Sequence, residues 1–400
     1  MPASCSSTGQ CLTRDSQAGE PFTLASKLEA MRVGIIGAGI SGLALGAALH
    51  RNGMDVQIHE SHSQVRGGGS GITLAPNGLA ALDALGIGAR FRELQQNQVP
   101  LRGGIRNPQG NWLTHIPAEV TKASLALGRS ELHALLIDDI PEARIHTSAE
   151  ALAVDASSGV VTFANGAVEQ FDVVVGADGI RSAVRRSCFD GPEISYAGYS
   201  AWRAITEGPV LDAGFETWGA GARFGTVPLH DGRVYWFAVR TGPEAQPGET
   251  GLSQLRDAFG QWHEPIPALL RSTPDESIQY LPIQELASPL PSYHSGKAVL
   301  VGDAAHAMTP NLGQGACQGL EDAAVLAGLL QKGTVDLSAY DEHRLRRSQQ
   351  IARQSRLVGR AVHTGGARIA AARNWVLKRM PDAATNRQVQ AVTSWEMPTL

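Results

Sequence analysis

The 400-residue chain has few of the features from which a disulfide scaffold, a metal site or a nucleic-acid-binding surface is built. It contains only four cysteines, and no CxxC or HExxH spacing occurs. This excludes a disulfide framework and gives no support to a zinc site. The formal net charge is -4, so the chain lacks the overall positive field of a dedicated nucleic-acid binder. We therefore expect neither a bound metal nor a nucleic-acid partner.

Long hydrophobic runs are also missing. The most apolar stretch, residues 33–49, is interrupted by five glycines and a serine, and it is too short to span a bilayer. Residues 1–30 lack the basic start and apolar centre of a signal peptide. We interpret them as a disordered leader, or as sequence upstream of a natural start at Met31. We expect a cytoplasmic protein, monomeric or homodimeric, without stable membrane association.

What the sequence does contain is 45 glycines, and the first cluster of them forms a nucleotide-binding pattern. Gly37, Gly39 and Gly42 follow a predicted strand and open a predicted helix, and Glu60 ends the next strand. In such a unit the glycines allow a tight turn, close approach to a pyrophosphate and helix packing, while the acidic residue accepts ribose hydroxyls. The carboxylate disfavours a 2′-phosphate, which leaves FAD or NAD; the pattern does not separate these two.

Two later segments repeat the arrangement of a strand that ends in glycine and aspartate. Asp178 follows the run 172–176 and precedes a helix, so it can cap that helix or accept a hydrogen bond from a nucleotide, and these roles are compatible. Asp303 follows the strand 298–301 and is placed to bind a polyol hydroxyl. The loop from Pro310 to Gly313 can lie flat against a ring, and Gly315 opens a helix whose N-terminus stabilises negative charge.

The pattern of elements predicts an α/β fold with a discontinuous Rossmann-like domain. Segments 31–100, 125–186 and 290–335 form that domain in this prediction, and 1–30 precede it. Segments 101–124 and 187–289 are rich in strand-like patterns and are predicted to form an inserted, mostly antiparallel sheet that binds substrate. Residues 336–400 are predicted to be C-terminal helices, with a break at Gly365 and Gly366.

The C-terminal region contains an unusual run of positive charge. Between Arg344 and Arg379 there are nine arginines and one lysine, with no aspartate or glutamate. Two interpretations remain open, a face that attracts an anionic cofactor and an ordinary solvated helix surface.

Together these segments resemble the class A flavoprotein monooxygenases of the para-hydroxybenzoate hydroxylase type. Within that group the chain is most similar to the branch with FAD-dependent urate hydroxylase, salicylate hydroxylase and zeaxanthin epoxidase. Besides the three nucleotide motifs, the resemblance includes Gly71 to Asn77, Arg129 ahead of Leu132-His133, Ala201 to Arg203, and Pro228 ahead of Val234-Tyr235. It covers about residues 31–365.

The resemblance implies non-covalent FAD, NAD(P)H as a transient co-substrate, and O₂. No second GxGxxG with a following acidic residue occurs, so NAD(P)H would bind without a domain of its own. The cofactor-binding residues implied are Gly37, Gly39, Gly42, Glu60, Gly71, Ile72, Arg129, Asp178, Asp303, Gly313, Gly315 and Ala316. Arg203 and Pro310 are implied to lie at the reacting centre beside the flavin.

The implied activity is insertion of one oxygen atom, as hydroxylation or epoxidation, into an electron-rich aromatic or polyunsaturated small molecule by a flavin C4a-hydroperoxide. Two alternatives remain. The protein could be an FAD-dependent oxidase or dehydrogenase without oxygen insertion, or an FAD-containing protein that sequesters a hydrophobic ligand.

The inserted sheet is expected to supply the substrate face. Period-2 alternation places Tyr235 and Phe237 on one face of a strand and Trp236 on the other. Packing in the core is the competing interpretation for each aromatic residue. His306 is expected to be structural and His230 exposed in a turn. The candidate substrate residues are Trp202, Arg203, Trp218, Arg223, Phe224, Tyr235 and Phe237.

Overall fold

The computed structural model describes residues 31–98, 102–116, 118–244, 251–333, 336–363 and 366–400. The predicted leader, residues 1–30, lies outside the described residues. The predicted break at Gly365 and Gly366 falls partly outside them, between helices α12 (Ser338–His363) and α13 (Ala367–Leu377).

The predicted βαβ unit is confirmed by β1 (Arg32–Ile36), α2 (Ile40–Arg51) and β2 (Asp55–His59). These strands belong to a six-stranded sheet in the order β17-β18-β11-β1-β2-β7, in which only β17 runs antiparallel to its neighbour. Its central strands are almost fully buried, as continuous apolar runs in a parallel sheet require. The other strands are β7 (Ile145–His146), β11 (Val173–Gly176), β17 (His294–Ser295) and β18 (Ala298–Leu300).

A second, seven-stranded sheet has the order β16-β12-β15-β14-β13-β4-β5. All its neighbours pair antiparallel except β13 and β4. It unites strands from the two segments predicted to form the substrate sheet, although the domain boundaries themselves stay a prediction. Its strands are β4 (Arg102–Arg106), β5 (Trp112–Ile116), β12 (Ile194–Thr206), β13 (Ala213–Trp218), β14 (Ala222–Pro228), β15 (Val234–Thr241) and β16 (Gln279–Leu286).

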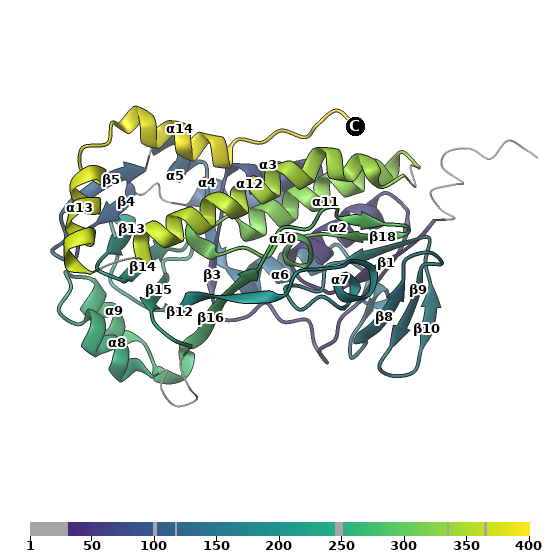
Figure 1. Cartoon of the computed structure of the whole chain (residues 1–400), viewed down its shortest axis with the longest axis horizontal. Helices are drawn as coiled ribbons and strands as arrows, with labels where there is room; N and C mark the ends of the chain where they lie inside the picture. Colours follow the sequence, from purple (N-terminus) through teal and green to yellow (C-terminus); the bar gives the residue numbers. More distant parts are fainter. Residues whose placement is uncertain (1–30, 99–101, 117, 245–250, 334–335, 364–365) are drawn as a thin grey trace, which may run out of the picture.

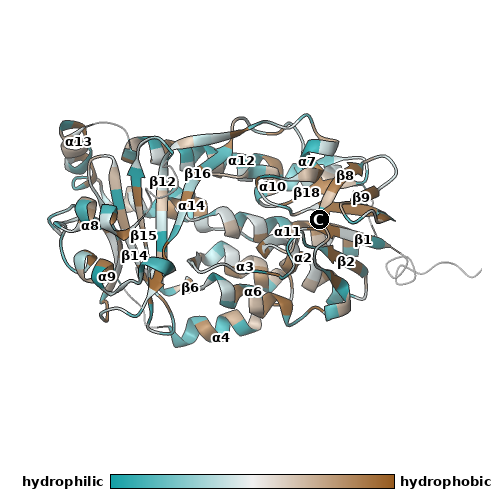
Figure 2. Ribbon diagram, turned by 90° about the horizontal axis from the view of Figure 1, so that it is seen from below, coloured by the Kyte–Doolittle hydropathy of each residue, from teal (hydrophilic) through white to brown (hydrophobic). Residues whose placement is uncertain are grey.

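Two helices that the strand pattern did not predict cover the outer face of this sheet. Helices α8 (Leu252–Phe259) and α9 (Ile266–Ser272) lie on the side away from the remainder of the molecule (Figure 2). Trp236 is fully buried beneath them together with Leu255 and Phe259. The predicted alternation in β15 is therefore confirmed, since Tyr235 and Phe237 point to the opposite, inner face.

Long helices connect the two sheets. Helix α11 (Gly315–Gln331) packs on α2 and on α3 (Pro76–Ala84), and α12 extends from the six-stranded sheet to the inserted sheet (Figure 1). Among the residues that the structure describes, no helix is both long and apolar enough to cross a membrane. The other helices are α4 (Ala89–Asn97), α5 (Ala118–Lys122), α6 (Arg129–Ile137), α7 (Ala183–Cys188), α10 (Asp303–His306) and α14 (Asp382–Thr393).

Smaller elements complete the fold. A two-stranded sheet pairs β3 (Gly71–Leu74) with β6 (Leu125–Gly128), and a three-stranded sheet contains β8 (Ala151–Asp155), β9 (Val160–Phe163) and β10 (Val168–Gln170). The 3₁₀ turns are η1 (Glu142–Arg144), η2 (Asp275–Ser277) and η3 (Pro310–Leu312).

Candidate active site

The turn between β1 and α2 has the geometry that a pyrophosphate needs. Gly37 has a φ of +107°, and a Cβ there would lie 2.4 Å from the carbonyl oxygen of Ala177. A Cβ on Gly42 would lie 2.1 Å from the carbonyl oxygen of Gly37, so only glycine lets the helix pack on the turn. Gly39 is different, because a Cβ there would meet only one atom, at 3.8 Å. Space is thus left outside Gly39, at the N-terminus of α2, where an anion is stabilised.

Glu60 stands beside this turn as an ionised carboxylate. Its Oε2 accepts from the backbone N–H of Ala38 at 3.0 Å, and its Oε1 accepts from that of His62 at 2.9 Å. Burial opposes ionisation, but these hydrogen bonds outweigh it and lower the pKa of Glu60. A negative oxygen next to the pyrophosphate turn suits the hydroxyl groups of an adenosine ribose and repels a 2′-phosphate.

Asp178 bonds to the N-terminus of a helix and retains one free oxygen. Its Oδ2 accepts from the backbone N–H of Ala183 at 2.7 Å and of Val184 at 3.2 Å, so it satisfies the first N–H groups of α7, while the N-cap residue itself is Ser182. Its buried Oδ1 has no partner, and burial raises the pKa of the carboxyl group. An unpaired buried acceptor favours a ligand that donates a hydrogen bond.

Cofactor and substrate candidates meet where β3 and α6 face the inserted sheet. A Cβ on Gly71 would lie 2.4 Å from the ring of Tyr235, so β3 packs directly on that ring. Arg129, the first residue of α6, lies within electrostatic range of Arg203, Asp303 and Tyr235. Burial and then the charge of Arg203 lower the pKa of Arg129, while Asp303 opposes this. Ile72 follows Gly71 and is partly exposed.

The loop between α10 and α11 turns one face outward. Pro310 begins η3, and Gly313 is left-handed with a φ of +62°. Both are exposed, and so is Asp303. Added Cβ atoms on Gly313 and Gly315 would meet nothing within 4 Å. A planar ring can therefore approach this backbone closely, with the N-terminus of α11 and the partly exposed Ala316 beside it.

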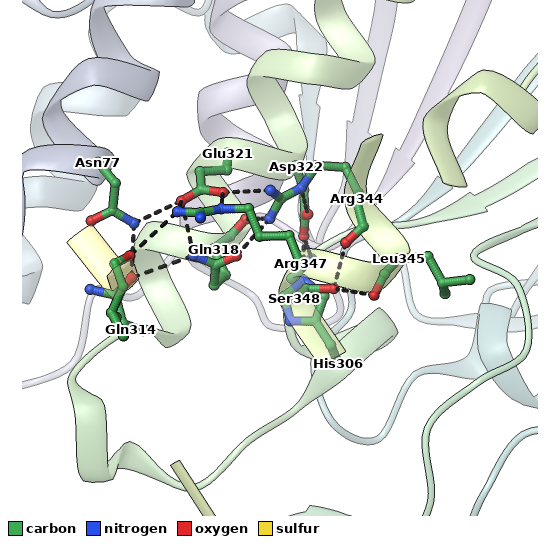
Figure 3. A network of polar contacts seen from close by, with 12 residues as sticks. Asn77, His306, Gln314, Gln318, Glu321, Asp322, Arg344, Leu345, Arg347 and Ser348 are labelled. Atoms are coloured by element: carbon green, nitrogen blue, oxygen red, sulfur yellow. Dashed lines mark hydrogen bonds and ion pairs between the residues drawn. The ribbon is translucent and has the colours of Figure 1, made fainter. Parts of the chain in front are cut away.

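Behind the loop lies a buried polar network that fixes its inner face (Figure 3). Gln314 is 2% exposed, and its side-chain oxygen accepts from Asn77 at 2.8 Å. Asn77 also donates to Glu321, which pairs with Arg344 and Arg347. The loop between α10 and α11, which is predicted to lie against a ring, is thus connected through Gln314 to α3 and α12.

Asp322 occupies the centre of the same network. It pairs with His306 at 2.5 Å and with Arg344 at 2.7 Å, and all three side chains are buried (Figure 3). Although burial works against its charge, His306 and Arg344 hold the pKa of Asp322 at about 2. His306 thus has the structural contact that was expected of it.

The inserted sheet divides the predicted substrate residues between its two faces. Arg203 pairs with Phe237 across β12 and β15, and Arg223 pairs with Trp218 across β13 and β14, so these four and Tyr235 belong to the inner face. Trp202 and Phe224 lie on the outer face, in the core with Trp236. The structure therefore does not bring these last two together with Arg203.

Arg203 and Arg223 are incompletely paired. Both Nε atoms are buried without a hydrogen-bond partner. Arg223 is 2% exposed, and it forms a long ion pair of 3.4 Å with Glu216. Buried guanidinium groups in this state suit a ligand with a carbonyl or anionic oxygen.

Helix α12 adds residues that the sequence patterns did not single out. His363, at its end, stacks on Tyr199 with 4.0 Å between ring centroids. The Tyr199 hydroxyl accepts from Asn311 at 2.8 Å. No local sequence pattern identifies His363 as a site residue. Its position depends on how α12 packs against strands of the inserted sheet, which lie more than 100 residues earlier in the chain. His230 lies in a turn as predicted, but the expectation that it is exposed was wrong, since its side chain is 15% exposed and pairs with Glu131 at 2.9 Å.

No group of three or more metal-ligating side chains was found among the described residues. A cavity of about 650 Å³ lies between α3, α5, α14 and the segment after α14, and none of the predicted site residues lines it. It is lined by Pro76, Ala80, Glu119, Val120, Gln390, Thr393, Ser394, Trp395 and Glu396.

Comparison with known proteins identifies the family and several relatives of this chain. A family described as "FAD binding domain" matches residues 30–355. The chain is 35% identical over 375 residues to aurachin C monooxygenase/isomerase of Stigmatella aurantiaca, covering 89% of this chain and 97% of that protein. It is 34% identical over 373 residues to 2-heptyl-3-hydroxy-4(1H)-quinolone synthase of Pseudomonas aeruginosa, covering 89% and 96%.

The fold also matches solved structures. The crystal structure of Klebsiella pneumoniae HpxO with FAD and uric acid has a TM-score of 0.82 and 24% identity, and the match covers 91% of this chain and 96% of that one. At this identity the likeness is one of fold.

Proposed function

Because the chain belongs to the FAD-binding-domain family and is an FAD-dependent monooxygenase, we propose that its substrate is a nitrogen heteroaromatic of the 2-alkyl-4(1H)-quinolone type. Hydroxylation at the ring carbon between the carbonyl and the alkyl group would give a 3-hydroxy-4(1H)-quinolone. The relative that makes such a product matches this chain over 96% of its length.

The observation that carries the proposal is the convergence of Arg203, Tyr235, Arg129 and Asp303 beside the open loop. Phe237 adds an aromatic wall on the same sheet face, and the buried Nε atoms of Arg203 and Arg223 are unpaired. A flat bicyclic ring with one carbonyl oxygen matches a face of this composition.

The residues present fit FAD, and they act by binding and positioning. Gly37, Gly39 and Gly42 would hold the pyrophosphate, Glu60 the ribose, and Gly313, Gly315 and Ala316 the ring. When bound, FAD accepts hydride from NAD(P)H and activates O₂ for transfer to the substrate. Pro310 and the inner face of the sheet would exclude water, and Arg203 would orient the substrate's oxygen.

Four further properties belong to this proposal. We propose the domain division given above, a cytoplasmic location, a monomer or homodimer, and no nucleic-acid partner. The net charge of -4, which gives no overall positive field, supports the absence of a nucleic-acid partner.

Oxygen labelling tests the proposed reaction. The purified holoenzyme, 2-heptyl-4(1H)-quinolone, NADH or NADPH and ¹⁸O₂ are combined, and the product is analysed by mass spectrometry. We expect quinolone-dependent NAD(P)H oxidation and one ¹⁸O atom in the product. Uric acid, salicylate and a polyene serve as comparison substrates. Hydrogen peroxide formed one-to-one with oxidised quinolone, without label in the product, would instead identify an oxidase.

A further inference from the structure

Two buried side chains on the inner face of the inserted sheet carry a donor and an acceptor that the described chain leaves unpaired. Arg223 is 2% exposed and its Nε has no partner, and His363 is 7% exposed and its Nε2 has no partner. Buried polar atoms in native proteins almost always have partners. Because the two residues also lie within electrostatic range of each other, these unpaired atoms point to a ligand that supplies their counterparts.

The contacts of Thr241 are compatible with a His363 tautomer that leaves Nε2 as an acceptor. The Thr241 hydroxyl oxygen lies 3.3 Å from the backbone oxygen of His363 and 3.1 Å from its Nδ1. When the hydroxyl donates its single proton to the backbone oxygen, Nδ1 is the donor to Thr241 and Nε2 is a bare acceptor. Burial, and then the charges of Arg223 and Arg373, lower the pKa of His363 to about 3, so the ring stays neutral near pH 7.

The position of this ring is fixed on two sides. Tyr199 stacks on it with an interplanar angle of 14°, and Thr241 holds Nδ1. Tyr199 is in turn bonded to Asn311 of the loop between α10 and α11. The acceptor is thus pre-organised relative to the loop that lies against the cofactor.

Arg223 lies on β14, next to the strand β15 that carries Thr241. Its Nη1 faces Glu216 at 3.4 Å, and its guanidinium group lies 5.7 Å from the Phe237 ring. Arg223 lies within electrostatic range of both His363 and Tyr199, while neither Nε nor Nε2 has a protein partner.

We propose that Arg223 and His363 recognise the two polar edges of a heteroaromatic lactam or vinylogous amide. The Arg223 Nε–H donates to the ring carbonyl, and the His363 Nε2 accepts from the ring N–H. This inference rests on the proposed substrate class and deepens it, because it assigns the N–H as well as the carbonyl to named residues. A carboxylate, which only accepts hydrogen bonds, would leave the His363 Nε2 without a donor.

Paired ligands test the His363 contact directly. The FAD-loaded full-length protein is titrated with 2-heptyl-4(1H)-quinolone and its N-methyl derivative, and with 4(1H)-pyridone and its N-methyl derivative. Binding is followed by calorimetry and by the flavin absorbance change. We expect wild-type protein to bind each N–H ligand at least about tenfold more tightly than its N-methyl partner, because N-methylation leaves Nε2 unpaired.

Two substitutions of His363 separate the hydrogen bond from the stacking. His363→Phe keeps the ring on Tyr199 but has no acceptor, so it should bind both members of a pair equally. His363→Gln offers an amide oxygen and should restore part of the discrimination. His115→Phe changes an exposed histidine at the outer strand β5 and should retain the wild-type ratio. Arg223→Met should weaken both members of a pair by a similar factor.

The outcomes are distinguishable. An equal N-methyl penalty in wild type and His363→Phe, no penalty in wild type, or no binding by either pair would overturn the assignment. If the ratio depends on His363 while labelled oxygen never enters the quinolone, the recognition pair stands and the proposed reaction fails.

Discussion

Single residues in this site combine positive charge with incomplete pairing. Arg129 and Arg203 lie within electrostatic range of each other, with Asp303 as the nearby opposite charge. Tyr235 packs against Gly71 of β3 and lies within electrostatic range of both arginines; burial raises its pKa while Arg203 opposes this. Buried positive charge with incomplete pairing is more typical of a binding site than of a structural salt bridge.

Replacement of Arg203 tests this view. Arg203→Ala should lower kcat/KM for quinolone-stimulated NAD(P)H oxidation by about tenfold to a hundredfold, the range expected for a lost charged hydrogen bond. FAD content should change little. Arg240→Ala, at an exposed arginine of the adjacent strand, is the control. Unchanged kinetics in Arg203→Ala would remove Arg203 from the site.

At the scale of elements, the turn from β1 into α2 separates two roles of glycine. Gly42 is required by packing, because its Cβ would overlap the Gly37 carbonyl oxygen. Gly39 has ordinary backbone angles, with φ −77° and ψ −178°, and open space around it. Its identity therefore matters only if something approaches the backbone from outside.

The two glycines make a matched pair of tests. Gly42→Ala should lower both the thermal stability of the apoprotein and its FAD affinity. Gly39→Ala should leave the apoprotein stable and weaken FAD binding by about tenfold or more, because the methyl group faces the bound pyrophosphate. Melting curves and FAD titrations of the apoprotein measure the two effects. Equal FAD affinity in Gly39→Ala and wild type would contradict the assignment.

Across the whole molecule, buried charges connect the helices that carry the loop. Arg344 is fully buried between Glu321 and Asp322 of α11, and Arg347 pairs with Glu321 (Figure 3). The basic run in the C-terminal region is therefore neither a uniform anion-binding face nor a uniformly solvated surface. Some of its arginines form contacts between elements, as Arg356 does with Glu285 of β16.

Replacement of Arg344 should lower the free energy of unfolding substantially. Arg344→Met leaves two buried carboxylates with fewer partners, and we expect a loss of about 3–5 kcal/mol in the free energy of unfolding. Arg346→Met, at an exposed position of the same helix, should change it by less than about 0.5 kcal/mol. Urea denaturation measures both. Equal midpoints would show that the network contributes nothing to stability.

The same network predicts that the protein loses stability at low pH. The pKa of Asp322 is about 2 in the folded protein, against an ordinary 3.8. A depressed folded-state pKa contributes stability above the unfolded value and loses it as the pH falls through the folded one. The unfolding free energy should therefore decline between about pH 4 and pH 2. The decline should be smaller in Asp322→Asn, which is already less stable at pH 7; equal slopes would contradict this assignment.

Local patterns were sufficient for those parts of the protein whose structure depends on neighbours in the sequence. The strand, glycine turn and helix at residues 32–51 follow from hydrophobic periodicity and backbone freedom, and so does the alternation of Tyr235, Trp236 and Phe237. Helices α8 and α9 were not predicted, because they form where tertiary packing covers the outer face of a sheet. The relation to flavin monooxygenases was also visible in the order of three short motifs.

The sequence by itself was sufficient to predict the three glycine-containing turns expected to contact a dinucleotide, since each of these turns lies between a strand and a helix that follow one another in the chain. Only the tertiary structure decided which face of the inserted sheet is the inner one. It placed Trp202 and Phe224 in the core, and Arg203, Arg223 and Tyr235 on the inner face. It also brought His363 to Tyr199 and Arg344 to Asp322. These contacts join segments with no local constraint between them, so their partners are set by how whole elements pack.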